Sequence, residues 1–277
     1  MKFQILVDSS ADMDKNYLNA SDIGFGIVPL TIHAGNVEFV DDENLDAHKM
    51  LNAIHSTKEK SGTACPSPEA WLKHYGNAEF TFVVAMTSKL SGTFNSANVA
   101  RDMAENKQNI YVFDTLATSG TLELVCDEIV RLINENKTFE EIIPLVNDFI
   151  KTRNLFFLLH RFDNLVANGR MSRFAGFMAK TLVIKPICTA SPEGTIDMVS
   201  KSIGSLNAYR KTVDLAFARC TDFSNRKCII THCNNEEDAF KIKEMLQTKC
   251  NFKEIIVKPM HGLTSFYALE KGLIICF

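Results

Sequence analysis

Residues 89–97 read KLSGTFNSA, and they stand between an apolar run at residues 80–86 and a helical pattern that reaches about residue 104. A short apolar run bounded by turn residues predicts a buried strand, and the pattern that follows has the period of about 3.6 residues that is typical of a helix. The stretch is therefore expected to form a tight loop between a strand and the N-terminus of a helix.

This loop has the residue types of an anion-binding turn. Ser91, Thr93 and Asn95 are all types that cap a first helical turn, and Gly92 lets the backbone approach a ligand closely. Free N–H groups and the positive end of a helix dipole would suit a carboxylate or a phosphate. An ordinary N-cap uses the same residues, so the loop alone leaves both interpretations open.

The first part of the chain alternates predicted strands with predicted helices. Apolar runs between polar turns predict the strands, and apolar residues at three- and four-residue spacing predict the helices. The strands are expected at residues 3–7, 27–32, 37–40, 80–86 and 109–113, and the helices at residues 46–55, 118–134 and 139–151 beside the one that ends near residue 104. Such alternation implies a parallel sheet with helices on both faces.

The pattern changes after residue 153. Strands are expected at residues 155–159, 183–188, 195–199, 228–231, 254–257 and 273–277, with helices at residues 205–219 and 236–247. We therefore predict an α/β fold of two domains, an α/β/α parallel-sheet domain at residues 1–153 and a mixed-sheet α+β domain at residues 154–277. Because no low-complexity linker separates them, the domains are expected to pack directly on each other.

Composition and charge exclude several classes of partner. The chain has 277 residues, of which 46% are hydrophobic and 23% are charged, as is usual for globular proteins. Its formal net charge of −3 argues against a nucleic-acid or anionic-membrane surface, since both need clustered Lys and Arg. No apolar run approaches the roughly 18 residues of a membrane span, and no signal-peptide core precedes the first strand. A cytoplasmic protein without an integral membrane segment is expected.

No metal site stands out. The eight cysteines contain no C-x-x-C pair, and several lie in apolar runs, so we expect free buried thiols. Asp8 and Asp12 follow the first strand, at the sheet edge where ligands bind in open α/β folds. Short polar loops usually turn and cap rather than hold an ion, and we predict neither a metal nor a cofactor here.

A second hydroxyl is a candidate for anion binding. Thr63 stands in the loop at residues 61–69, which Pro66 and Pro68 keep extended before a helix begins near Ser67. Its hydroxyl could donate a hydrogen bond to an anion. A plain helix-entry loop explains the same residues.

Four segments, in order along nearly the whole chain, resemble the DegV family of fatty-acid-binding proteins. They are Asp8-Ser9-Ser10, Thr63-Ala64-Cys65-Pro66-Ser67, Leu90-Ser91-Gly92-Thr93 with Asn95-Ser96-Ala97, and Gly169-Arg170-Met171-Ser172 followed by Lys185-Pro186-Ile187. The resemblance implies two domains with a fatty-acid tunnel between them, and a carrier rather than an enzyme. A long-chain fatty acid would be the ligand, and a separate kinase would be the protein partner that makes the acyl-phosphate.

The resemblance also implies roles for single residues. Thr63 and Ser91 would hydrogen-bond the fatty-acid carboxylate, with backbone donors around Gly92 and Thr93. Arg170 would lie near the head group and aid phosphoryl transfer by the kinase, and a structural arginine is the alternative. A buried carboxylate needs several donors to offset its lost hydration, which agrees with the residue types of these loops.

The chain departs from the family pattern near its end. The usual run with a histidine before Gly-Pro-Gly is absent, and residues 262–268 read GLTSFYA. Thr264 falls at the place of that histidine, and His261 lies three residues earlier. Either residue, or neither, would replace it. Asn168 and Cys65 stand where glycine and glutamine are common.

Two alternatives to a carrier remain at this point. One is a phosphotransferase or hydrolase that uses the Ser91 loop as an anion cradle, with His160, His232 or His261 as a base. The sequence has no G-x-x-x-x-G-K-[ST], G-x-S-x-G or H-E-x-x-H motif to support it. The other is a regulatory protein of DegV type with a different apolar ligand.

Overall fold

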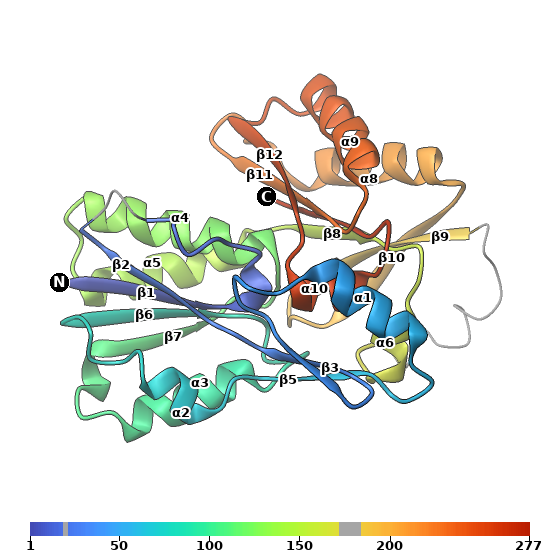
Figure 1. The fold of residues 1–277 in the computed structure, drawn as a ribbon. Helices are drawn as coiled ribbons and strands as arrows, with labels where there is room; N and C mark the ends of the chain where they lie inside the picture. Colours follow the sequence, from blue (N-terminus) through green and yellow to red (C-terminus); the bar gives the residue numbers. More distant parts are fainter. Residues whose placement is uncertain (19–21, 172–183) are drawn as a thin grey trace.

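The structure, a computed structural model, describes residues 1–18, 22–171 and 184–277 of the 277-residue chain. A parallel-sheet unit and a mixed-sheet unit lie against each other, as predicted (Figure 1). Ser172 of the glycine-arginine motif and Val183 of a predicted strand lie outside the described residues.

The first unit is built on four parallel strands in the order β2-β1-β6-β7. Their bounds are Phe3–Asp8 for β1, Gly24–Val28 for β2, Phe80–Ala85 for β6 and Ile110–Asp114 for β7. Helices α4 (Gly120–Asn134) and α5 (Phe139–Lys151) cover one face, and α2 (Pro68–Leu72) and α3 (Thr93–Met103) cover the other. Because helices cover both faces, all six residues of β1 are buried. Single turns of 3-10 helix lie at Ser9–Ala11 and Lys107–Asn109.

A small antiparallel sheet extends from this unit. It has the order β4-β3-β5, with β3 at Thr31–Ala34, β4 at Val37–Val40 and β5 at Gly62–Ala64. The strand predicted at residues 37–40 is confirmed, but the single strand predicted at residues 27–32 is wrong. The chain leaves the parallel sheet after Val28 and joins the small sheet at Thr31, because Pro29 has no N–H to continue a ladder.

Thr63 lies in a strand and not in the predicted open loop, because it pairs with Ile32 across β3 and β5. Helix α1 (Ala47–Ser56) precedes this strand, close to the predicted residues 46–55, and Asp46 is its N-cap. The Asp46 carboxylate accepts a hydrogen bond from the Lys49 N–H at 2.9 Å.

The second unit has six strands in the order β10-β9-β8-β13-β11-β12, all antiparallel to their neighbours except the β11–β12 pair. Their bounds are Leu155–Leu158 for β8, Ile184–Ala190 for β9, Ile196–Ile203 for β10, Lys227–His232 for β11, Glu254–Pro259 for β12 and Leu273–Cys276 for β13. Helices α8 (Ser205–Arg219) and α9 (Glu236–Lys249) cover one face.

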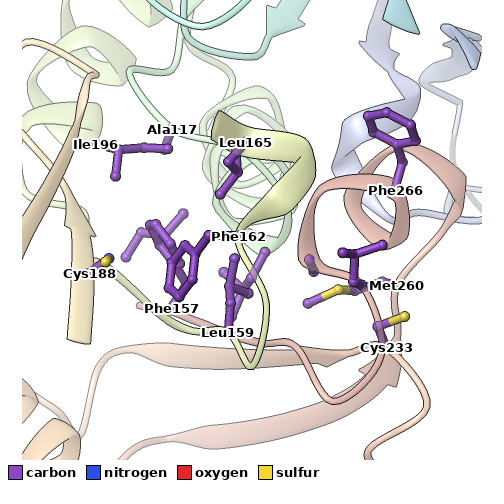
Figure 2. Close-up of a cluster of buried hydrophobic side chains, with 14 of the residues drawn as sticks. Ala117, Phe157, Leu159, Phe162, Leu165, Cys188, Ile196, Cys233, Met260 and Phe266 are labelled. Carbon is purple, nitrogen blue, oxygen red and sulfur yellow. The ribbon is translucent and has the colours of Figure 1, made fainter. Parts of the chain in front are cut away.

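The other face of this sheet turns toward the first unit. Helices α6 (Asp163–Ala167) and α10 (Gly262–Ala268) pack there with α1 around one large apolar cluster (Figure 2). Helix α10 was not expected from the sequence, and it occupies the segment that departs from the family pattern. All strands of the parallel sheet precede residue 115 and all strands of the mixed sheet follow residue 154. The domain division at residue 153 stays a prediction.

Charged side chains join the two units beside this cluster. Glu123 of α4 is buried and accepts hydrogen bonds from Lys227 of β11 at 2.7 Å and from Lys258 of β12. Lys258 also donates to the Asp12 carbonyl at 2.6 Å. These bonds fix the mixed sheet against the parallel-sheet unit.

All eight cysteines are free, as predicted, and all are buried except Cys65, which is exposed. Of the helices in the described ranges, none combines the length and the apolar character needed to cross a membrane.

Candidate functional site

The Ser91 loop is held by the strand ends around it. After β6, the Met86 N–H donates to the Asp8 carboxylate at 2.7 Å, and the Ser88 N–H donates to the Asp114 carboxylate at 3.1 Å. Hydrogen bonds from the N–H groups of Leu90 and Ser91 to the Thr87 carbonyl then close the turn. The carboxyl ends of three parallel strands therefore fix the place where α3 begins.

The N-terminus of α3 presents hydroxyl and backbone donors. The Ser91 hydroxyl accepts from the Thr93 N–H at 3.3 Å and lies 2.8 Å from the Thr93 hydroxyl. The first bond within the helix runs from the Ser96 N–H to the Gly92 carbonyl, so the helix itself does not use the N–H groups of Phe94 and Asn95. No side chain caps the helix at Gly92, so these N–H groups are the ones that the predicted anion site would use.

The segment with Thr63 lies against this turn. The Ser96 hydroxyl donates to the Pro66 carbonyl at 2.6 Å. A Cβ atom at Gly92 would stand 3.1 Å from the Cys65 sulfur, so the two segments are in close contact there. The Thr63 hydroxyl lies 2.8 Å from the Tyr267 hydroxyl of α10.

Arg170 closes the site from the mixed-sheet unit. Its Nε donates to the Leu90 carbonyl at 3.0 Å and its Nη1 donates to the Asn168 carbonyl at 2.5 Å. Its Cζ lies 6.0 Å from the centre of the Tyr267 ring. A guanidinium has five N–H groups, so others remain for an anion.

The Ser91 turn and Arg170 border a polar cleft of about 640 Å³. Its described lining includes Ser91, Gly92, Asn95 and two cations, Lys89 and Arg170. No Asp or Glu belongs to that lining in the described part of the chain. The cleft therefore favours a negatively charged group.

A smaller apolar cavity of about 90 Å³ lies behind the cleft, between the two sheets. Four residues border both spaces, namely Leu90, Arg170, Thr195 and Ile196. Most of the remaining lining is aliphatic or aromatic, as Figure 2 shows for Ala117, Phe157, Leu159, Leu165 and Ile196. Arg170 carries the one charged side chain in the described lining of this cavity. The arrangement suits a molecule with an apolar tail and an anionic head.

The sequence-predicted site residues fall into three groups. Ser91, Gly92 and Arg170 line the polar cleft. Thr63 and Thr93 are held next to it by the hydrogen bonds to Tyr267 and to Ser91. Thr264 and His261 lie in and beside α10, and their donors have partners within the protein.

Asp12 takes up the donors of Thr264 and His261. Thr264 lines the apolar cavity, but its hydroxyl donates to the buried Asp12 carboxylate. That carboxylate also accepts from the His261 N–H at 2.7 Å, and the His261 ring stands 4.0 Å from Asp14. His261 is therefore not brought to the cleft or to the cavity in the described linings.

Two further buried carboxylates accept hydrogen bonds from backbone N–H groups. Asp8 accepts from the N–H groups of Ser10 and Met86, and Asp41 accepts from those of Gly262 and Leu263. Burial raises the pKa of each to about 6 despite these hydrogen bonds. Over the described ranges no group of three His, Cys, Asp or Glu side chains could hold a metal ion.

Tyr267 and Asn168 are site residues that the sequence reasoning missed. Tyr267 lines the apolar cavity and reaches Thr63, and Asn168 lines the polar cleft. Asn168 had been noted only as a departure from the family pattern. Tyr267 stands one helical turn after Thr264, so the spacing of α10 would have drawn attention to it had that helix been predicted.

Comparisons with known proteins agree with this geometry. A family model described as an uncharacterised protein of the DegV family matches residues 2–275. A DegV domain-containing protein of Streptococcus gordonii is 33% identical over 279 residues, which cover 99% of this chain and 98% of the relative.

Two solved structures share the fold over nearly their whole length. A DegV family protein from Eubacterium eligens, loaded with heptadecanoic acid, is 33% identical with a TM-score of 0.91, and the match covers 99% of this chain and 98% of that one. The Fatty Acid Kinase (Fak) B3 protein of Streptococcus pneumoniae, loaded with linoleic acid, is 31% identical with a TM-score of 0.93, and the match covers 100% and 99%.

Proposed function

The chain belongs to the DegV family, and on that premise we propose that it is a carrier that buries a long-chain fatty acid and presents its carboxylate to a separate kinase. Two relatives of similar structure are loaded with heptadecanoic acid and with linoleic acid. We propose a fatty acid for this chain as well, because the chain has its own apolar cavity next to a cleft with cations.

One observation carries the proposal. The apolar cavity between the sheets borders the polar cleft at Leu90 and Arg170, and the described lining of that cleft has cations without carboxylates. At about 90 Å³ the cavity is smaller than a long acyl chain, so in this proposal the space between the sheets widens as the chain enters and the carboxylate reaches the cleft. A ligand that was polar throughout would leave its groups unpaired against Phe157, Leu159 and Leu165.

The energetics suit a tight carrier. Burial of about fifteen methylenes at about 0.8 kcal/mol each gives a gross stabilisation of about 12 kcal/mol. The entropy cost of ordering the acyl chain reduces this value. The carboxylate then needs donors to offset its lost hydration. We assign the donor role to the Ser91 hydroxyl, to the backbone N–H groups around Gly92 and Thr93, and to the Thr63 hydroxyl, which the Tyr267 hydroxyl holds in place.

The kinase partner accounts for the open cleft. A fully enclosed carboxylate could not be phosphorylated, whereas the cleft leaves the head group open beside Arg170. The name of the Streptococcus pneumoniae relative, a fatty acid kinase B3 protein, supports such a partner. In this proposal Arg170 aids phosphoryl transfer by stabilising charge at the carboxylate or at the incoming phosphate.

The described site does not support the alternative of a phosphotransferase or hydrolase, because no candidate base lines it. None of His160, His232 and His261 belongs to the described lining of the cavity or the cleft. His232 accepts a hydrogen bond from the Asn235 N–H at 3.3 Å, which is a local structural contact.

Native mass spectrometry of the purified protein, followed by extraction of the bound molecule, tests the proposal. The expected result is an added mass of one fatty acid per chain, with weaker retention in Ser91→Ala. The exposed residue Ser224 gives a matched control, and Ser224→Ala should keep the load. A protein that arrives empty and binds no added C14–C18 fatty acid would refute the carrier.

A further inference from the structure

A second polar pocket, of about 410 Å³, adjoins the apolar cavity and shares no lining residue with the Ser91 cleft among the described residues. Leu116, Ala117, Leu155 and Ala190 border both this pocket and the apolar cavity. The pocket stands where the two units meet, between the loop after β7, the end of α5 and the end of β9.

The charges of this pocket are mainly positive. Lys151, Arg153 and Arg219 line it together with Asp197, which has an interaction of its own. Lys151 pairs with Asp148 at 2.8 Å on the surface. Among the described residues no carboxylate lies within 4 Å of the Arg153 or the Arg219 guanidinium. Residues 19–21 and 172–183 contain no Asp or Glu that could supply one.

Arg153 lacks a partner for a buried donor. Its Nε is buried and has no hydrogen-bond acceptor among the described residues. Its Cζ lies 3.8 Å from the centre of the Phe149 ring, and its Nη2 donates to the Thr152 hydroxyl at 2.7 Å. Burial and the nearby Arg226 lower the pKa of Arg153 to about 10, so it stays charged at neutral pH. Arg153 is half-buried, and the carboxylate that acts on it, that of Glu128, lies beyond ion-pair distance and pairs with Arg131. An anion in the pocket would therefore stabilise the Arg153 charge further.

Arg219 is held at the same pocket from the mixed-sheet unit. Its Nη1 donates to the Thr189 hydroxyl at 2.9 Å, and its Cζ lies 4.7 Å from the centre of the Phe156 ring. Thr189 in turn donates to the Leu155 carbonyl at 2.7 Å. Both guanidinium groups are thus oriented by aromatic rings and hydroxyls, which leaves other N–H groups for a ligand.

We propose that Arg153 and Arg219 form a second, oxyanion-binding site in the pocket that adjoins the apolar cavity. A carboxylate or a phosphate-sized group matches two forked guanidinium donors. The anion has two possible sources, a small free oxyanion or the far-end carboxylate of a dicarboxylic acid whose chain lies in the apolar cavity. The second source rests on the proposed fatty-acid function, and the first does not.

Isothermal titration calorimetry distinguishes the two sources. Inorganic phosphate, hexadecanoic acid and hexadecanedioic acid are titrated into delipidated protein, into Arg153→Gln and into Arg219→Gln. The control is Arg210→Gln, which removes an exposed arginine of α8 that does not line the pocket. Because Arg153 packs on Phe149, thermal melts check that its variant folds, and the exposed Arg219 gives a second test if it does not.

A free-anion site predicts saturable phosphate binding that weakens about tenfold in each pocket variant and not in the control. A far-end carboxylate predicts that the diacid binds about tenfold more tightly than the monoacid, and that Arg219→Gln removes this preference. Phosphate binding that persists in both variants, or no binding of phosphate and no preference for the diacid, would overturn the site. Phosphate binding without any hexadecanoic acid binding would support the site and refute the carrier.

Discussion

The Thr63 and Tyr267 hydroxyls lie 2.8 Å apart, and this contact joins the strand beside the Ser91 loop to the helix that lines the apolar cavity. The two residues are 204 positions apart in the chain. Thr63 belongs to the Thr-x-x-Pro-Ser segment, which matches the family pattern. Tyr267 belongs to residues 262–268, where this chain departs from that pattern. The contact therefore links the unusual α10 to the proposed head-group site.

Removing either hydroxyl should weaken fatty-acid binding. Tyr267→Phe and Thr63→Val each delete one partner of a single hydrogen bond, and a net contribution of about 0.5–1.5 kcal/mol corresponds to an affinity loss of roughly two- to tenfold. Because both act through one contact, the double variant should be no weaker than the weaker single variant. Titration of hexadecanoic acid measures all three.

The control for this cycle is Tyr209→Phe, which deletes the hydroxyl that donates to Asp238 at 2.8 Å, away from the site. It should leave the affinity unchanged. If the losses in Tyr267→Phe and Thr63→Val add fully in the double variant, the two hydroxyls act separately on the ligand and the proposed link is wrong.

Arg170 should matter for the charge of the ligand rather than for its tail. Arg170→Gln removes a cation of the polar cleft but keeps the apolar lining, so hexadecanoic acid should bind about tenfold more weakly while its methyl ester binds as before. Parallel titrations of acid and ester provide the measurement. An equal loss for both ligands would show that Arg170 only supports the loop, through its bond to the Leu90 carbonyl.

Local sequence signals predicted much of the fold. Helices α5 and α8 lie at residues 139–151 and 205–219, the bounds that their patterns indicate. The start of α5 is fixed by a capping box, in which Thr138 and Glu141 bond each other's backbone. The Ser91 turn was predicted for the same reason, since a strand, a glycine and capping residues specify it locally.

The rest of the site depends on contacts that no local pattern contains. The apolar cavity is bordered by residues from the loop after β7, from β8, α6, β10 and α10, so it exists only after the two units pack. Thr63 looked like a loop residue because a three-residue strand has too little periodicity to be recognised. Asp12 takes the Thr264 hydroxyl through a contact spanning 252 positions, so spacing alone could not show that this donor is occupied.

A larger side chain at Ala117 should fill the apolar cavity. Ala117 is buried and lines the cavity, so Ala117→Leu should lower the affinity for hexadecanoic acid at least about tenfold while the ligand-free protein keeps its stability. The matched control is Ala97→Leu, in the filled core between α3 and the parallel sheet, where overpacking should reduce stability by roughly 1–3 kcal/mol. Chemical unfolding of both variants, with titration of the folded ones, tests this contrast. Strong destabilisation by Ala117→Leu would mean that no usable space lies beside Ala117.

Stability should rise as the pH falls toward 4.5 because of Asp41. Burial raises the pKa of this carboxyl from 3.8 to about 6 in the folded protein, so between those values the folded state binds a proton that the unfolded state does not. Each pH unit in that window adds up to about 1.4 kcal/mol to the free energy of unfolding, which gives about 3 kcal/mol in all.

Asp41→Asn cannot take up this proton, although it also weakens the hydrogen bonds to the Gly262 and Leu263 N–H groups at every pH. The difference in unfolding free energy between the wild-type protein and Asp41→Asn should therefore grow between pH 7.5 and pH 4.5 in urea titrations. Asp8→Asn should show the same trend, since burial also raises the pKa of Asp8 to about 6. A difference that stays constant or shrinks as the pH falls would mean that the hydrogen bonds to Asp41 outweigh its burial and hold it ionised.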